Sequence, residues 1–197
     1  MQTFTDARPF VQDDSFEIER HKALPQLREE LKKGSIDPPI IGLLEEFIKI
    51  PHCFTLQSCY GHFVHDKESD FHNVEQLSNF PDKTKEVNYR IAYMALCIRN
   101  DDAGKQLFQD IQDLTKIDLT YIQFGSANWF WERQVNSYTI QIEPERSKNT
   151  DSVRISFDEA IYIENLKNEV FTALFGIALK HQILTGHSNS PSVKNSL

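Results

Sequence analysis

The stretch Phe54–Phe63 holds the residues of this chain that are best suited to chemistry. A hydroxyl (Ser58), a thiol (Cys59), a glycine (Gly61) and an imidazole (His62) follow a run that alternates like a β-strand. Because Gly61 permits positive φ and a close backbone approach, N–H groups and small side chains there could face a ligand. A β-hairpin turn with a half-buried cysteine fits the same spacing. The residues alone leave both interpretations open.

Cysteine nucleophiles and zinc sites both draw on the residue types in this region. A nucleophilic Cys59 would need a nearby base such as His62, although no aspartate or asparagine can be assigned to orient that ring. Cys59, His62, His65 and His72 are also residue types that zinc accepts, but their spacing matches none of the common zinc patterns. Histidines in polar loops are more often solvated than ligating, so we expect no metal and keep zinc as an alternative.

A second candidate site lies in residues 124–131. Both tryptophans of the chain, Trp129 and Trp131, occur there beside Ser126 and Asn128. An aromatic wall of this kind could stack on a purine or an adenosyl group. Large aromatic side chains also pack against sheets or cover a neighbouring subunit, so that alternative stays open. Alternation along a strand would place both tryptophans on one face.

The helices and arm that precede Phe54 can be placed from apolar periodicity and capping signals. Residues 1–12 are expected to form an extended arm. A helix is expected from Asp14, its N-cap, to a stop at Gly34, and Pro25 either kinks it or marks the start of a second helix at Leu24. Asp37 is expected to cap a second, heavily apolar helix that leads to a strand at 54–58.

The second half of the chain alternates apolar strands with two helices. Asp101 is expected to cap one helix, and Ser156 with Glu159 forms a capping box for a long final helix. The further strands are expected at 89–98, central in its sheet, and at 119–124, 137–142 and 152–157, with a loop at 66–88 and a turn at Gly125. This order indicates an α+β fold, a mixed β-sheet with packed helices.

Composition limits what the chain can be. Its 197 residues suit one domain, which we place at 1–184 with a disordered tail at 185–197. A net charge of −8 disfavours tight binding of tRNA, which requires a basic face. Three cysteines are too few for a disulfide framework, and no membrane-spanning or signal run is visible, so we expect a cytoplasmic protein. Gly-rich phosphate loops, dinucleotide fingerprints and nucleophile elbows are absent from the sequence.

The order of features from Asp37 to His62 resembles the wybutosine-synthesis methyltransferase family, the third enzyme of tRNA wybutosine synthesis. Its members have a helix that starts at an Asp-x-x-Ile pattern, then a phenylalanine and threonines that lead into Ser-Ser-Cys-Ser-Gly-Arg. The matching residues here are Asp37, Ile40, Phe54, Thr55, Ser58, Cys59 and Gly61. The differing residues are Gln57, Tyr60 and His62, where the family has two serines and the arginine. A looser similarity covers 93–107 and 121–126.

This resemblance implies a methyltransferase that uses S-adenosylmethionine and acts on a modified tRNA guanosine, or here on a smaller substrate. The sulfonium of that cofactor is already activated, so the enzyme mainly aligns and desolvates donor and acceptor. The implied cofactor contacts are Thr55, Ser58, Cys59, Gly61, Ser126 and Trp129. The implied catalytic residues are Cys59 and His62, with His62 as a proton acceptor.

A non-catalytic ligand-binding or regulatory module is the alternative from a different class. In that case the turn at Gly61 is structural, the tryptophans form a homodimer surface, and no cofactor binds. Cleft geometry separates the two interpretations. Convergence of Ser58, Cys59, His62 and an aromatic ring on one cavity favours the enzyme.

Overall fold

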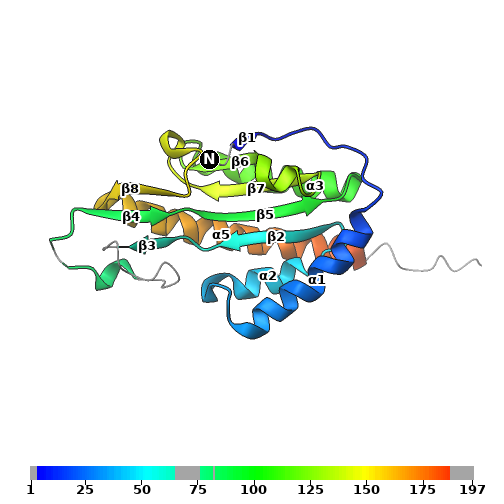
Figure 1. Cartoon of the computed structure of the whole chain (residues 1–197), viewed down its shortest axis with the longest axis horizontal. Coiled ribbons are helices and arrows are strands. Elements are labelled where there is room, and N and C mark those ends of the chain that lie inside the picture. The colour runs from blue at the N-terminus through cyan, green and yellow to red at the C-terminus, as the bar shows by residue number, and fades with distance from the viewer. Residues whose placement is uncertain (1–3, 65–75, 82, 187–197) are drawn as a thin grey trace, which may run out of the picture.

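Two antiparallel sheets with helices packed on them form the structure, so the predicted α+β class is confirmed (Figure 1). The computed structural model describes residues 4–64, 76–81 and 83–186. Its strands are β1 (Phe4–Asp6), β2 (Cys53–Cys59), β3 (His62–Val64), β4 (Glu86–Arg90), β5 (Ala92–Ile98), β6 (Ile122–Ala127), β7 (Ser137–Ile142) and β8 (Ser152–Ser156). Its α-helices are α1 (Phe16–Lys33), α2 (Ile41–Phe47), α3 (Asp102–Gln112), α4 (Asn128–Trp131) and α5 (Phe157–Gly186).

The two sheets are joined by strands that run from one into the other. The larger sheet has the order β1-β6-β7-β5-β2, and the smaller has the order β3-β4-β8. β2 leads into β3 through Tyr60 and Gly61, and β4 leads into β5 through Ile91 (Figure 1). Of the predicted site residues, Cys59, Gly61 and His62 therefore lie at the junction of the sheets.

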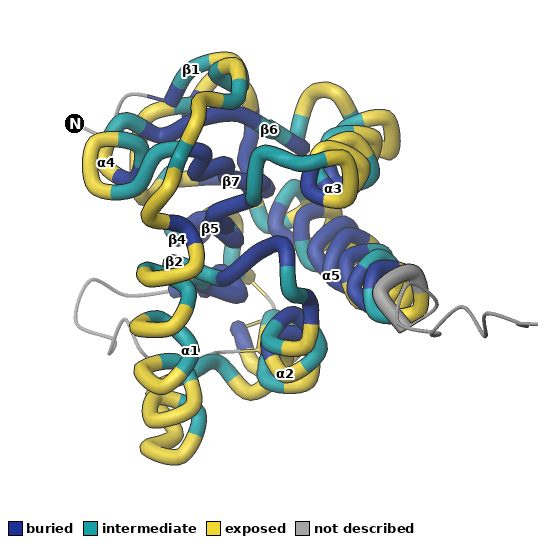
Figure 2. Tube along the Cα trace, turned by 90° about the vertical axis from the view of Figure 1, so that its right-hand side faces the viewer, coloured by how far each residue is buried: buried dark blue, intermediate teal, exposed yellow. Residues whose placement is uncertain are grey.

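The large sheet has an inner and an outer face. On the inner face, apolar residues of β5 and β7 pack with α2, α3 and α5 into the main core (Figure 2). The outer face contacts α4, and α1 packs beside β2. Along β7, Tyr138, Ile140 and Ile142 face the core, whereas the intervening positions are the polar Ser137, Thr139 and Gln141. Those polar residues are buried as well.

Several expectations from the sequence are confirmed. β7 matches the expected strand at 137–142, and β5 is an internal strand. The Asp101 side chain accepts a hydrogen bond from the Gly104 N–H at 2.7 Å, as a cap should. Ser156 Oγ accepts from the Glu159 N–H at 3.1 Å at the start of α5. α1 ends at Gly34 in the left-handed conformation with φ 69°.

Other boundaries were wrong. α1 begins at Phe16 after Ser15, so Asp14 is not its cap. β4 begins at Glu86, inside the expected loop, and Ile91 separates it from β5. The strand expected at 119–124 is instead β6, which begins at Ile122. The residues before Ile122 form a turn in which the Asp118 carboxylate accepts hydrogen bonds from the N–H groups of Thr120 and Tyr121.

Gly125 does not form a turn. It lies within β6 opposite Asp6, because the N-terminal arm contains β1 and pairs with β6. A Cβ at Gly125 would lie 2.1 Å from the Thr5 carbonyl oxygen, so the glycine serves this close backbone approach.

The ends of the chain can be described in part. Residues 185 and 186 belong to α5, and the rest of the expected disordered tail lies outside the described residues. Within the described part of the chain, no helix combines the length and apolar character needed to cross a membrane.

Candidate functional site

A register irregularity in β2 places Cys59 on the outer face of the sheet. Thr55 pairs with the core residue Leu96, and the register shifts between Thr55 and Gln57. Because of this shift Gln57 pairs with Ala95, and Cys59 pairs with Tyr93 on the outer face. Regular alternation would have pointed these side chains into the core.

A cavity of about 620 Å³ opens on the outer face beside α4. This volume falls within the range that is typical for small-molecule sites. Among its lining residues are Gln57, Tyr93, Asn128, Trp129, Thr139 and Gln141. Trp129 is 54% exposed, and the Arg133 guanidinium stacks on its ring at 3.2 Å from the centroid.

Thr139 and Gln141 of β7 line this cavity, and Glu143 follows just after the strand without lining it. Thr139 Oγ1 and Glu143 Oε2 are buried and have no hydrogen-bond partner among the described residues. Gln141 lies between them and donates its amide N–H to Glu143 Oε1. Burial raises the pKa of Glu143 to about 8. Buried polar atoms normally have partners, so Thr139 Oγ1, which lines the cavity, is a candidate for a ligand contact.

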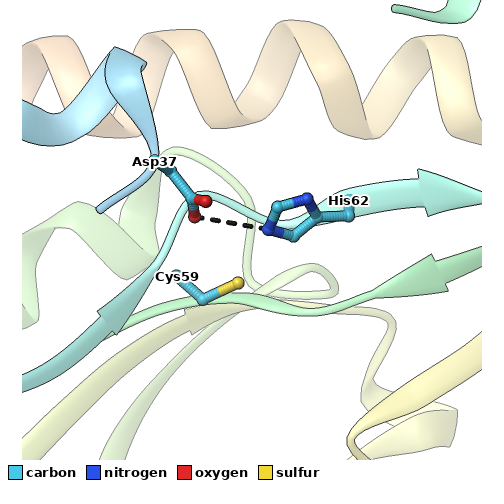
Figure 3. A group of neighbouring side chains, drawn as sticks. All are labelled: Asp37, Cys59 and His62. Carbon is cyan, nitrogen blue, oxygen red and sulfur yellow. Dashed lines mark ion pairs between the residues drawn. The ribbon is translucent and has the colours of Figure 1, made fainter. Parts of the chain in front are cut away.

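Three polar side chains meet at the sheet junction (Figure 3). They are Asp37, Cys59 and His62, and one oxygen, one sulfur and one nitrogen atom lie within 4.8 Å of one another. Asp37 stands at the cap position before Pro38, but it makes no capping hydrogen bond there. Its Oδ2 instead accepts the Tyr60 N–H at 2.7 Å and lies 3.3 Å from His62 Nε2.

Charge pairing in this cluster shifts two pKa values. Hydrogen bonds to Asp37 and Cys59 raise the pKa of His62 to about 10, against the effect of burial. For Asp37, burial raises the pKa, but the hydrogen bonds with His62 and the Tyr60 N–H outweigh it and hold the pKa below its usual value. His62 therefore carries a proton at neutral pH and is suited to donate a hydrogen bond rather than to accept a proton.

A buried lysine on α5 contacts the turn between β2 and β3. Lys167 is 1% exposed, and its ammonium donates to the Gly61 carbonyl at 3.1 Å and pairs with Glu164 at 2.7 Å. The same ammonium lies 4.2 Å from the centroid of the Tyr60 ring. Burial lowers the pKa of Lys167, and Glu164 opposes that shift.

The cluster and the cavity are neighbours. Cys59 pairs across the strands with Tyr93, and His62 pairs with Arg90. Tyr93 and Arg90 both line the cavity. Directly opposed residues of paired strands share one face of the sheet, so the cluster adjoins one side of the cavity.

The structure brings together only some of the residues named from the sequence. Cys59, Gly61 and His62 lie at the cluster, and Trp129 lies at the cavity. The remaining three, Thr55, Ser58 and Ser126, do not line the cavity. Thr55 and Ser58 pair with the core residues Leu96 and Met94, and Ser126 Oγ accepts the Arg8 N–H at 3.1 Å.

The expected common face of the two tryptophans was wrong. They lie on the short helix α4, where residues two apart point in nearly opposite directions. Trp129 lines the cavity, whereas Trp131 packs against Tyr138 with the Arg8 guanidinium over its ring. Of the four histidine and cysteine residues considered for zinc, His65 and His72 lie outside the described residues.

Sequence reasoning missed Asp37 as a site residue and missed the polar residues of β7. Asp37 was taken as a helix cap, and its partners Tyr60 and His62 are distant in sequence. A signal for β7 did exist, because Ser137, Thr139, Gln141 and Glu143 alternate with apolar residues. What the pattern could not tell is that this polar face is buried.

Comparisons with known proteins give a short stretch of similarity. No family model matches the chain. Over 52 residues it is 36% identical to a tRNA(Phe) 7-((3-amino-3-carboxypropyl)-4-demethylwyosine(37)-N(4))-methyltransferase from Thermococcus sibiricus. This stretch covers 26% of each protein, so the chain spans about a quarter of the curated relative it matches. The match is too short to place the protein in that family.

The comparison with solved structures gives matches to two archaeal proteins, among others. Two structures of the PH1069 protein from Pyrococcus horikoshii match with TM-scores of 0.47 and 0.43, each at 15% identity. They cover 89% of this chain and 96% and 95% of their own. A hypothetical protein from Aeropyrum pernix matches with a TM-score of 0.41 at 12% identity, over 75% of this chain and 98% of that one. Scores below 0.5 add nothing to the assignment of the site.

Proposed function

We propose that this chain is a methyltransferase-like protein that binds S-adenosylmethionine in the cavity on the outer face of the large sheet. The observation that carries the proposal is the cavity itself, which is about 620 Å³ in volume and adjoins the cluster of Asp37, Cys59 and His62. The short similarity to a tRNA methyltransferase supports the same class of reaction.

The cavity offers the groups that an adenosyl ligand requires. Trp129 and Tyr93 supply aromatic surface on which a purine can stack. The amides of Asn128 and Gln57 and the buried Thr139 hydroxyl supply hydrogen-bond partners for the base and ribose. Thr55, Ser58 and Ser126, named from the resemblance, are left out of this proposed contact set because they do not line the cavity.

Methyl transfer requires no further reactive group from the protein. The enzyme must hold the donor carbon and the acceptor nitrogen in line and exclude water. Cys59 and His62 adjoin the cavity without lining it, so no direct contact with the acceptor is assigned to them. The proposed acceptor is a free modified guanosine nucleoside or another small molecule. A whole tRNA is disfavoured by the net charge of −8.

Calorimetric titration with S-adenosylmethionine and with S-adenosylhomocysteine tests the proposal. Binding is expected for both ligands, and Trp129→Ala and Thr139→Val should each weaken it by about tenfold through loss of stacking or of one hydrogen bond. Tyr162→Ala serves as a matched control, because Tyr162 is an exposed aromatic residue on α5 that does not line the cavity. An absence of heat at high micromolar ligand, in protein shown to be folded, would reject the proposal.

A non-catalytic ligand-binding module is the second candidate. It is favoured by the fact that neither Cys59 nor His62 lines the cavity directly. The two candidates separate when formation of S-adenosylhomocysteine is measured by mass spectrometry with modified guanosine nucleosides as acceptors. Binding without turnover supports the module, and turnover supports the enzyme.

A further inference from the structure

The atoms that meet at the sheet junction are the donor types that transition metals prefer. Asp37 offers an oxygen, His62 a nitrogen and Cys59 a sulfur, all within 4.8 Å of one another (Figure 3). Zinc accepts all three kinds of ligand and binds them in a tetrahedron. The sequence led us to expect no metal, because the spacing of Cys59, His62, His65 and His72 matches no common zinc pattern; Asp37 was not among the ligands considered.

The separation of Asp37 and His62 is compatible with two ligands of one ion. Asp37 Oδ2 and His62 Nε2 lie 3.3 Å apart. A charge-assisted N–H···O hydrogen bond is usually about 2.7–2.9 Å long. Oxygen and nitrogen ligands at about 2.0–2.1 Å from a tetrahedral ion are about 3.3 Å from each other.

The orientation of His62 separates a metal site from a catalytic triad. In a triad, one ring nitrogen faces the nucleophile and the other faces the carboxylate. Here the nitrogen that faces the Asp37 carboxylate also lies on the side of the Cys59 sulfur (Figure 3). The three side chains therefore converge on one point instead of forming a relay through the ring.

Backbone hydrogen bonds from the turn hold two of the three donors. The Tyr60 N–H donates to Asp37 Oδ2 at 2.7 Å, and the Gly61 N–H donates to Cys59 Sγ at 3.4 Å. Contacts of this kind orient metal ligands and are a regular part of metal sites. The Asp37 side chain is 18% exposed, which gives an ion a route from solvent.

The nearby charges balance a divalent ion. Lys167 is a buried cation that interacts electrostatically with Cys59 and Asp37, and Glu164 is its direct partner. Because metal ligands bind deprotonated, Cys59 would contribute a thiolate, and the three anionic groups Asp37, Cys59 and Glu164 together offset Lys167 and the divalent ion.

We propose that Asp37, Cys59 and His62 bind a divalent transition-metal ion of the zinc type. Three protein ligands leave the fourth position to water or to a ligand, as in zinc sites that act on substrates. This site is independent of the proposed cofactor cavity, because none of its three ligands lines that cavity.

Metal content and cobalt substitution test the site directly. The full chain, purified without chelator, is expected to retain about one zinc ion per molecule. After removal of the metal, titration with Co²⁺ should give a sulfur-to-cobalt charge-transfer band and the visible bands of a four-coordinate ion. Cys59→Ser should abolish the charge-transfer band, and Asp37→Asn and His62→Gln should weaken binding more than about 100-fold.

Controls separate this site from adventitious binding. Cys97→Ala removes a thiol that lies elsewhere in the core and should leave the cobalt spectrum unchanged. A His65→Ala/His72→Ala double variant should also retain the ion. Circular dichroism checks folding, and Asp37→Asn, at the most exposed of the three ligands, keeps the test valid if Cys59→Ser does not fold. Absence of both retained zinc and a cobalt band, or a band that survives Cys59→Ser or depends on His65 and His72, would overturn the proposal.

Discussion

Gly61 and Ala92 are in contact where the two sheets join. A Cβ built on Gly61 would lie 2.8 Å from the Ala92 Cβ and 2.9 Å from the Ala92 nitrogen. Gly61 also has φ 84°, in the left-handed region. Because Cys59 and His62 flank this glycine, the close approach of the two strands fixes how the candidate site is built.

Gly61→Ala is expected to destabilise the protein. The positive φ costs about 1–2 kcal/mol for a residue with a Cβ, and the contact with Ala92 adds to this because it involves backbone atoms that cannot move aside. Urea denaturation measures the loss. Gly176→Ala is the control, because a Cβ there meets nothing within 4 Å in the middle of α5, and it should stabilise by about 0.5–1 kcal/mol. Equal stability of wild type and Gly61→Ala would show that the junction is not tight.

The turn at Gly61 could be predicted from the sequence because glycine is the residue type that adopts positive φ without strain. A glycine at the end of an apolar strand predicts positive φ or a close approach, and Gly61 has both. The same logic failed at Gly125, where the close approach is made by the N-terminal arm and not by a turn. The local sequence shows where a glycine occurs, but only the neighbouring strand shows whether it serves a turn or a close approach of two backbones.

The site itself could be predicted only where its residues are adjacent in the chain. Cys59 and His62 were found together, but Asp37 joins them through the fold and was interpreted as a helix cap. The irregularity in β2 that turns Cys59 to the outer face leaves no mark in the pattern of apolar residues. The cavity was missed because its polar residues on β7 have the pattern of a solvated face.

Lys167 is expected to be important for stability. Lys167→Met leaves the Gly61 carbonyl and Glu164 without their partner, and an unpaired buried group costs about 1–3 kcal/mol. The double variant Lys167→Met/Glu164→Gln should recover part of this loss, because it also removes the unpaired charge. Lys180→Met is the matched control. Its ammonium pairs with Asp110 at the surface, so a change of less than about 1 kcal/mol is expected.

The stability of the protein is expected to fall in mild acid because of His52. This ring is buried, its Nε2 lies 3.1 Å from His181 Nδ1, and His181 in turn contacts Asp110. Burial and the neighbouring His181 lower the pKa of His52 from 6.5 to about 4. Between those values the unfolded chain binds a proton that the folded protein does not, so stability decreases by up to about 3 kcal/mol as the pH falls.

The contribution of His52 can be separated from that of other groups by comparing variants. Urea unfolding of wild type and His52→Gln at pH 7 and pH 5 should show a smaller loss for the variant, because glutamine does not titrate. His21→Gln, an exposed position on α1, is the control and should keep the loss of the wild type. Parallel losses in wild type and His52→Gln would contradict the burial of a neutral ring.

Glu143 is expected to make the stability of the protein depend on pH in the opposite direction. Burial raises its pKa from 4.5 to about 8, so the folded protein keeps a proton that the unfolded chain loses over that range, and stability falls as the pH rises. Glu143→Gln has the same shape, can still accept the Gln141 amide, and has no charge to bury. It should match wild type near pH 5 and be the more stable protein at pH 8, as measured by urea unfolding. Glu145→Gln, an exposed neighbour, should follow wild type at both values. If Glu143→Gln showed no advantage at pH 8, the carboxyl group would be ionised in the folded protein, and a cation or ligand donor beside it would have to be sought.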